Sequence, residues 1–176
     1  MLKEAKEVKE VKEVKKMRVY YTGDNYTVRD IDEKDIEKNK NIIINLLENN
    51  LLISFPKIKC PFETACENYE AMIKFQQDKS AILIGYFTGD TIAGFIWAYK
   101  RTVFTEQRLH ITHLIVDIIY RRKGAGTMLI NALKQKAAEF GAGTIELMTS
   151  ADNLRALKFY EYCGFQAARV QLELKN

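Results

Sequence analysis

The sequence predicts an α/β (α+β) fold, in which helices cover both faces of a mixed, mostly antiparallel sheet. Segments rich in β-branched and aromatic residues follow one another in the middle of the chain, separated by short polar turns. Segments with apolar residues at helical spacing flank them on both sides. The chain has 176 residues, 47% of them hydrophobic and 28% charged, which suits one domain with a single core.

The individual elements are predicted from the spacing of apolar residues, which alternate in strands and recur every three or four residues in helices. The first half should contain a strand at 26–29, a helix at 32–48 capped by Asp32, an apolar connection at 51–60 and a helix beginning at Pro61. The second half should contain strands at 81–87, 91–101 and 109–117, a helix at 121–140, a strand at 144–149, a helix at 153–163 and a strand at 170–174.

Residues 1–24 are predicted to form a charged extension, either flexible or a marginal helix, ahead of the folded domain at 25–176. Residues 3–16 repeat Lys-Glu-Val or Lys-Glu-Ala in threes, so this segment has little apolar surface with which to dock on a core. We expect no catalytic role for it. The sequence leaves open whether Met17 is the true start.

The composition argues against several classes of protein. Three cysteines without a Cys-x-x-Cys pair and only two histidines do not suit a disulfide framework or a metal site, so we expect no metal and a cytoplasmic location. No apolar stretch approaches the roughly 18 residues of a membrane span, and no membrane partner is expected. The net charge of +4 is small and partly due to the extension, so nucleic acid is not an expected partner.

A loop between a predicted strand and a predicted helix has the features of a polyphosphate site. Gly124 and Gly126 lie where the helix should begin, and glycine lets the backbone approach a phosphate without a Cβ in between. The first N–H groups of a helix are unpaired and carry a partial positive charge. Arg121, Arg122 and Lys123 add full positive charges beside them.

The spacing of the glycines narrows the choice of polyphosphate. A P-loop needs four residues between its glycines and then Gly-Lys-Ser or Gly-Lys-Thr, which this loop lacks. A dinucleotide fingerprint needs a third glycine at the position of Leu129. ATP and NAD are therefore disfavoured.

Two motifs together point to one family. The run Arg121-x-x-Gly124-x-Gly126 resembles the pyrophosphate motif of the GNAT superfamily, the acyl-CoA-dependent N-acyltransferases. The second signature of that family is similar to the run Asn153-x-x-Ala156-x-x-Phe159-Tyr160-x-x-x-Gly164-Phe165. The resemblance covers about residues 25–174, although Ile118 stands where members often have proline. It implies a sheet that splays between the fourth and fifth predicted strands, and acetyl-CoA as co-substrate.

The resemblance also implies roles for single residues. The strand residues would pair with the pantetheine amides, the loop backbone would hold the pyrophosphate, and the asparagine would bind the pantetheine arm. These cofactor-binding residues are Leu114, Val116, Arg121, Arg122, Lys123, Gly124, Ala125, Gly126, Thr127 and Asn153. Tyr160 would protonate the departing thiolate, a step for which a phenol is a suitable acid.

A base has to remove a proton from an amine before its nitrogen can attack a thioester. His110 occupies the position on the fourth predicted strand where some branches of the family carry a glutamate or histidine base. By period-2 alternation, His110 and Thr112 share a face with Leu114, and His113 points to the other face unless a bulge intervenes. His110 is the first candidate and His113 the second, with Glu106 and solvent as alternatives.

The expected function is transfer of an acetyl group from acetyl-CoA to a primary amine by direct attack. The resemblance implies that the first two predicted helices, their connection at 51–60 and the loop at about 99–108 bind the acceptor. A small amine or amino sugar is favoured over protein, because these segments offer aromatic side chains and no dense acidic patch. Cys163 has no histidine near it in sequence, which argues against a covalent cysteine mechanism. The alternative is a non-catalytic acyl-CoA-binding or regulatory protein, which would need neither Tyr160 nor a base. A homodimer is one of the assemblies that the sequence leaves open.

Overall fold

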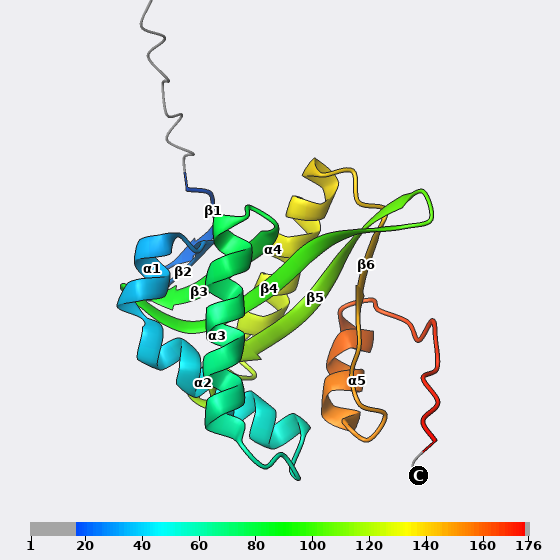
Figure 1. Cartoon of the computed structure of the whole chain (residues 1–176). Helices are drawn as coiled ribbons and strands as arrows, with labels where there is room; N and C mark the ends of the chain where they lie inside the picture. The colour runs from blue at the N-terminus through cyan, green and yellow to red at the C-terminus, as the bar shows by residue number, and fades with distance from the viewer. Residues whose placement is uncertain (1–16, 175–176) are drawn as a thin grey trace, which may run out of the picture.

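The computed structural model describes residues 17–174, which form one six-stranded sheet with helices on both faces (Figure 1). In chain order the elements are β1 (Val19–Gly23), β2 (Tyr26–Asp30), α1 (Glu33–Lys38), α2 (Lys40–Ser54), α3 (Pro61–Gln77), β3 (Ala81–Thr88), β4 (Thr91–Val103), β5 (Glu106–Val116), the 3₁₀ helix η1 (Ile118–Tyr120), α4 (Ala125–Glu139), β6 (Thr144–Leu147) and α5 (Leu154–Tyr162). None of the helices in residues 17–174 is both long enough and apolar enough to span a membrane.

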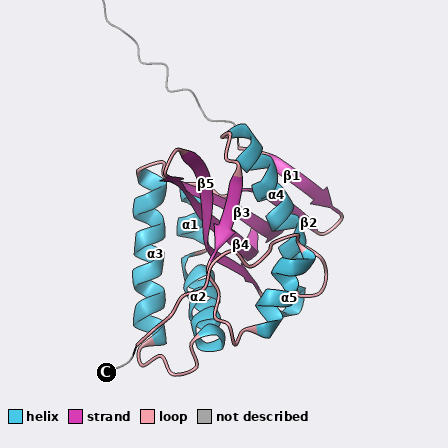
Figure 2. Cartoon of the chain, turned by 90° about the vertical axis from the view of Figure 1, so that its right-hand side faces the viewer, coloured by secondary structure: helices cyan, strands magenta, loops and turns pink. Residues whose placement is uncertain are grey.

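The strands lie in the order in which they occur in the sequence, and every neighbouring pair is antiparallel except β5 and β6. The mixed, mostly antiparallel sheet predicted from the sequence is confirmed. Helices α1, α2 and α3 cover one face of the sheet, and α4 and α5 lie on the other side (Figure 2). Alternation along β3 shows the two cores: Ile82 and Ile84 pack toward α4, and Leu83 and Phe87 toward α1–α3.

The first strand of the sheet lies inside the segment predicted as an extension. Val19–Gly23 forms β1 and pairs with β2, with Thr22 opposite Thr27 and Gly23 opposite Tyr26. The sheet therefore begins before residue 25. Because of this additional first strand, the fourth and fifth predicted strands are β5 and β6, and the predicted splay lies between them. The prediction for residues 1–16 lies outside the described residues.

The predicted helix at 32–48 is two helices, α1 and α2, separated at Asn39. Asp32 caps α1 as predicted, because its side chain accepts a hydrogen bond from the backbone N–H of Asp35 at 2.8 Å. The Asn39 side chain is buried, donates to the carbonyl of Asp35 and accepts from the backbone N–H of Ile92 at 3.0 Å. This side chain ties the helix junction to the start of β4, which the periodicity of the sequence does not reveal.

The β5 and β6 strands pair over only four positions, from Arg108 opposite Thr144 to Ile111 opposite Leu147. Beyond Ile111 the second half of β5 keeps β4 on one side and has no strand on the other among the described residues. This separation of β5 from β6 is the splay that the family resemblance implied. It leaves backbone N–H and C=O groups of β5 free for an added extended ligand.

The strand predicted at 170–174 is wrong, because residues 165–174 have no regular secondary structure. Val170, Leu172 and Leu174 do alternate, but their side chains are 86%, 89% and 93% exposed. Alternation alone does not make a strand, since a strand also needs a hydrogen-bonding neighbour, and no strand of the described residues pairs with this segment.

Candidate active site

A cavity of about 560 Å³ lies where β5 and β6 diverge. Its walls come from the end of β5, the loop before α4, the first turn of α4, and α5, and the C-terminal turn of α2 closes it from the other face of the sheet. The lining residues are Asn50, Ile53, Ser54, Leu114, Ile115, Val116, Arg121, Arg122, Gly124, Gly126, Thr127, Asn153, Arg155, Ala156, Phe159, Tyr160 and Tyr162. Both predicted motifs therefore meet in one space.

The N-terminus of α4 opens into this cavity without a side-chain cap. Its N-cap is Gly124, and the first hydrogen bond inside the helix runs from the N–H of Met128 to the carbonyl of Gly124 at 2.9 Å. The three N–H groups before Met128 have no acceptor among the described residues. They form the positive end of a 15-residue helix, which is a site for a phosphate group.

The loop before α4 is not helical, which corrects the predicted start at residue 121. Arg121 is extended, with φ −66° and ψ 154°, and ends the 3₁₀ helix η1. The left-handed Arg122 and Gly124, with φ of +61° and +84°, delay α4 until Ala125. Gly126 has ordinary helical geometry, but an added Cβ would lie 3.1 Å from the ring of Phe159. The first glycine is thus needed for backbone conformation and the second for close packing of α5.

Three arginines line the cavity and give it a positive potential: Arg121, Arg122 and Arg155. The Arg121 side chain donates from Nε to the carbonyl of Val116 at 2.7 Å, which fixes the guanidinium at the end of β5. Burial and the positive charge of Arg155 lower the pKa of Arg121. An anion bound between them would relieve this repulsion, so the electrostatics favour a phosphorylated ligand.

Helix α5 supplies the opposite wall of the cavity. Asn153 caps this helix by accepting a hydrogen bond from the N–H of Ala156 at 3.1 Å, and it is also one of the residues that line the cavity. The ring of Tyr160 packs edge-on against Phe159 and Phe165, at 5.3 Å and 5.5 Å between centroids. Burial, with a smaller effect of Cys163, raises the pKa of Tyr160 to about 12. This phenol keeps its proton through neutral and moderately alkaline pH.

The two histidines lie on the same face of β5, contrary to the predicted alternation. Trp97 pairs with His113 and the next residue, Ala98, pairs with Ile111, so Thr112 is an extra residue in a β-bulge. The bulge turns Leu114 toward α4, while His113 packs on Trp97 in the core under α2 and α3. The predicted alternation, which places His110 on the same face as Leu114, is therefore wrong for this strand.

His110 does not line the cavity. It lies close to the point where β5 and β6 separate, which we call the apex of the gap between these two strands. It pairs with Glu146, one position before the last pair between β5 and β6. Burial lowers the pKa of His113 from 6.5 to about 4, so its charged form is disfavoured. His113 is therefore the weaker candidate for a base, and His110 remains the first.

The match to a protein family agrees with this geometry. The model of the acetyltransferase (GNAT) family matches residues 47–165, more than half of the chain. The chain belongs to the GNAT family. It is an acetyl-CoA-dependent N-acetyltransferase, and the cavity residues fit the phosphorylated co-substrate that this family uses.

Individual relatives extend the match beyond the motifs. An uncharacterized N-acetyltransferase of Bacillus subtilis (strain 168), YdgE, is 23% identical over 84% of this chain and 96% of its own length. An L-ornithine N5-acetyltransferase of Arabidopsis thaliana is 29% identical over 51% of this chain and 40% of its own length. The solved structure of a putative acetyl transferase from Pyrococcus furiosus has a TM-score of 0.67 at 24% identity, covering 86% of this chain and 99% of that chain.

Most of the predicted co-substrate residues of this acetyltransferase reach the cavity. The exceptions are Lys123, whose Nζ lies 5.7 Å from the ring centre of Tyr120, and Ala125, whose side chain is buried in the core. Arg155 lines the cavity but belongs to neither sequence motif. The one feature that could have indicated its role is its place in the first turn of α5, close to Asn153. The residues from α2 were also missed, because they come from a distant part of the chain.

Cys163 is not arranged as a nucleophile in this acetyltransferase. The residue is buried at the end of α5, and burial raises the pKa of its thiol. A protonated, buried thiol is a poor nucleophile, which agrees with direct attack.

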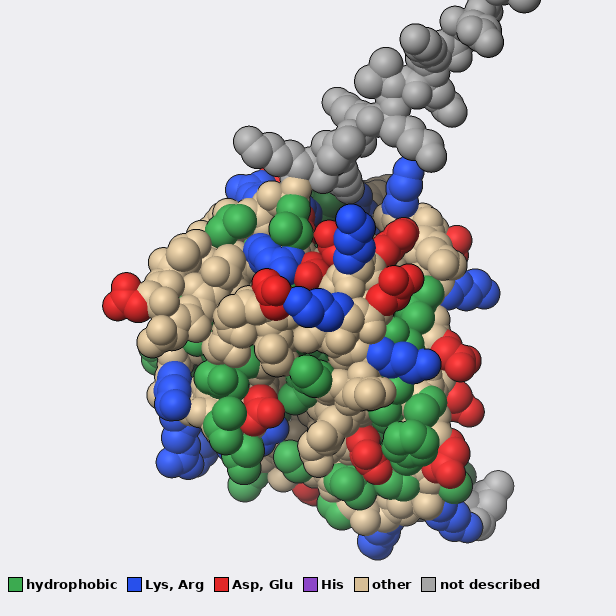
Figure 3. Space-filling view, turned by 90° about the vertical axis from the view of Figure 1, so that its left-hand side faces the viewer, with side chains coloured by type: hydrophobic (Ala, Val, Ile, Leu, Met, Phe, Trp, Pro, Cys, Tyr) green, Lys and Arg blue, Asp and Glu red, His purple; other side chains and the backbone are tan. Residues whose placement is uncertain are grey.

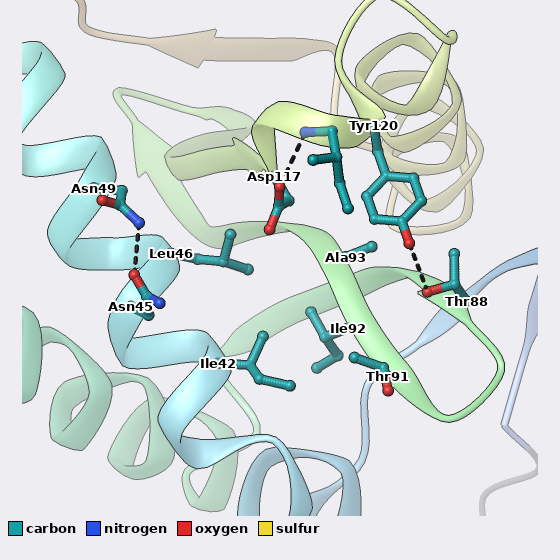
Figure 4. A pocket seen from close by; sticks show the side chains of 11 residues that line it. Ile42, Asn45, Leu46, Asn49, Thr88, Thr91, Ile92, Ala93, Asp117 and Tyr120 are labelled. Carbon is teal, nitrogen blue, oxygen red and sulfur yellow. Dashed lines mark hydrogen bonds between the residues drawn. The ribbon is translucent and has the colours of Figure 1, made fainter.

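A smaller hollow of about 250 Å³ lies on the other side of η1, between α2 and the turn from β3 to β4 (Figure 4). Its polar groups mostly contact one another or the backbone. Asn49 donates to Asn45 at 2.6 Å, the hydroxyls of Thr88 and Tyr120 lie 3.4 Å apart, and Asp117 accepts from the N–H of Ile119 at 3.0 Å. These contacts hold η1 in place and so position the loop that leads into α4.

The buried His113 makes the stability of this acetyltransferase depend on pH. Its pKa is about 4 in the folded protein and 6.5 as the usual value, so the unfolded chain binds the extra proton first as the pH falls. The stabilisation is present above pH 6.5 and is lost between pH 6.5 and 4, by roughly 3 kcal/mol. Urea unfolding should show this loss in the native protein and a smaller one in His113→Gln. Equal slopes in both proteins would mean that other groups cause the acid dependence.

Proposed function

We propose that this acetyltransferase moves the acetyl group directly from acetyl-CoA to the primary amine of a small molecule. The observation that carries the proposal is one continuous cavity that joins the uncapped start of α4, the open edge of β5 and the hydroxyl-bearing ring of Tyr160. In this proposal the start of α4 anchors the phosphates, the edge of β5 pairs with the pantetheine amides, and Tyr160 protonates the thiolate.

The direction of the co-substrate follows from these positions. Phosphates held at the start of α4 would lie beside Val116, because the two residues are close together. A Cβ added to Gly126 would lie 4.0 Å from a methyl carbon of Val116. The pantetheine arm would then extend along the open edge of β5 toward the apex of the gap, as an added strand. This course leads the thioester toward His110, which lies at that apex.

The proposed reaction has one bond-forming and one bond-breaking step. The amine nitrogen attacks the thioester carbonyl carbon, and the carbon–sulfur bond breaks as the amide forms. His110 takes a proton from the nitrogen through a water molecule, because it lies near the cavity and not in its wall. Tyr160 gives its proton to the leaving thiolate and regains one from solvent.

The surroundings of the gap favour a small acceptor over a lysine-rich protein. The side chains at the end of α2 and the start of α3 are partly exposed and apolar, among them Ile53, Phe55 and Phe62. On the side of the molecule away from the gap, where α1 and the β1–β2 edge lie, acidic and basic side chains are mixed (Figure 3). A relative that matches half of this chain is named for acetylation of ornithine, a small amine.

Replacement of Tyr160 by phenylalanine tests the acid step. We expect kcat to fall about tenfold or more while acetyl-CoA affinity stays the same, because only the hydroxyl serves a thiolate that forms late. Tyr86→Phe is a matched control, since Tyr86 is also a buried phenol but lies outside the cavity. If Tyr160→Phe turns over as fast as the native protein with chemistry rate-limiting, Tyr160 has only a packing role.

A further inference from the structure

A carboxylate and an imidazole, both mostly buried, face each other at the apex of the gap. Glu146 of β6 pairs with His110 of β5, and the distance between Oε1 of Glu146 and Nδ1 of His110 is 3.6 Å. The two side chains are 20% and 14% exposed. Both atoms are buried and lack a hydrogen bond of good geometry among the described residues, and the one charged group close to Oε1 besides the imidazole is Nε of Arg101, in an ion pair.

The charge of Glu146 is maintained by two arginines. Nε of Arg101 lies 2.9 Å from Oε1, and Nη1 of Arg108 donates to Oε2 at 3.0 Å. Burial opposes ionisation of Glu146, but the hydrogen bond from Arg108 and the charges of both arginines outweigh it and keep the pKa of this carboxyl below its usual value. The group that faces the imidazole is therefore an acceptor.

An acceptor at this place decides which imidazole nitrogen carries the proton. With the proton on Nε2, the lone pair of Nδ1 would face the carboxylate oxygen, and the buried Nδ1 would remain unsatisfied beside another acceptor. With the proton on Nδ1, a small rotation of either side chain closes a charge-assisted hydrogen bond. The second arrangement has the lower free energy.

The remaining nitrogen of the ring is available for a water molecule. Nε2 of His110 has no hydrogen bond to a described residue, and it is not among the buried polar atoms that lack a partner. The other groups around the ring are Tyr99 of β4, with ring centroids 5.2 Å apart, and the two arginines that bind Glu146. None of these supplies a second acceptor for Nδ1.

We propose that Glu146 is a positioning residue that holds His110 in the tautomer protonated at Nδ1, so that Nε2 can accept the proton of the acceptor amine. This inference rests on the proposed role of His110 as base. The carboxylate does not take up a proton itself. It orients the ring and stabilises the imidazolium that forms when Nε2 is protonated.

Glu146→Gln should reverse the tautomer. Nη1 of Arg108 donates to Oε2 and will hold the amide oxygen of the new side chain at that position, which places the NH₂ group at the position of Oε1, toward Nδ1, while Arg101 turns away from it. The lone pair of Nδ1 then accepts, and the proton moves to Nε2. We expect kcat to fall about tenfold or more with KM for acetyl-CoA nearly unchanged, as the wrong tautomer removes the base.

NMR of the imidazole nitrogens can follow this directly, because the chain has only two histidines and a His113→Gln background leaves one. The native pair should give a His110 signal protonated at Nδ1, and Glu146→Gln should give one protonated at Nε2. Glu106→Gln is the matched control, since Glu106 also binds Arg108, at 2.5 Å, but has no contact with His110 among the described residues. It should leave the tautomer unchanged.

The outcomes separate the two proposals. A His110 signal protonated at Nε2 in the native pair would overturn the positioning role of Glu146 and needs no folded variant. Reversal of the tautomer in Glu146→Gln without any loss of kcat would overturn it as well. Full turnover of His110→Ala would instead remove the base role itself, whatever the tautomer.

Discussion

Gly126→Val should bind acetyl-CoA about 100-fold more weakly than the native protein. The added side chain would stand at the first turn of α4, between Phe159 and the free N–H groups that we expect to hold the pyrophosphate. Loss of two charge-assisted hydrogen bonds, each contributing about 1.5–3 kcal/mol, accounts for a change of this size or larger. Isothermal titration calorimetry with acetyl-CoA gives the affinity.

The same substitution also presses on α5, so the loss of binding has to be separated from loss of folding. An added Cβ would lie 3.1 Å and 3.2 Å from two atoms at the tip of the Phe159 ring, which can move. Gly141→Ala is a control for loss of stability alone, because Gly141 has a left-handed φ of +64° that strains an alanine, and it lies past the far end of α4 with open space around it. An unchanged affinity in a folded Gly126→Val protein would refute the phosphate site.

His110→Ala should lower kcat about 100-fold or more, the usual effect of removing a general base. In the native protein, protonation of a histidine base switches off turnover at acidic pH, and this acidic limb of the kcat profile should disappear in the variant. A stopped assay of free CoA across pH 5.5 to 9 with a saturating amine would measure both effects.

His113 provides the contrast for this experiment. Its pKa of about 4 lies below that pH range, so His113 stays neutral throughout and cannot cause the limb. His113→Gln should therefore keep it. Retention of the limb in His110→Ala together with its loss in His113→Gln would show that His113 is the base.

The layers of the fold were predictable because strong periodicity and turn residues act locally. The meander of β3, β4 and β5, and the helices α3, α4 and α5, follow from such patterns. The break at Asn39 was not predictable, because its side chain bonds to Ile92, far along the chain. The missing last strand has the same kind of cause, since Val170 and Leu172 alternate correctly but no neighbouring strand satisfies the backbone.

The candidate site divides in a similar way. The glycines of the loop and the residues of α5 were found from the sequence, because each motif is contiguous and has a physical purpose at that spacing. The prediction that His110 shares a face of β5 with Leu114 was wrong, because one extra residue at Thr112 reverses the alternation beyond it. The partner of His110, Glu146, lies on another strand, and only the register of β5 and β6 brings the two together.

Mass spectrometry of one reaction mixture tests the central claim most directly. The protein is mixed with acetyl-CoA, a panel of small primary amines including ornithine and amino sugars, and a lysine-rich peptide. Direct transfer to a small amine predicts an N-acetylated small molecule, an equal amount of free CoA, and no acetyl group on the protein. An acetyl group retained on Cys163, or acetylation of the peptide alone, would contradict the account.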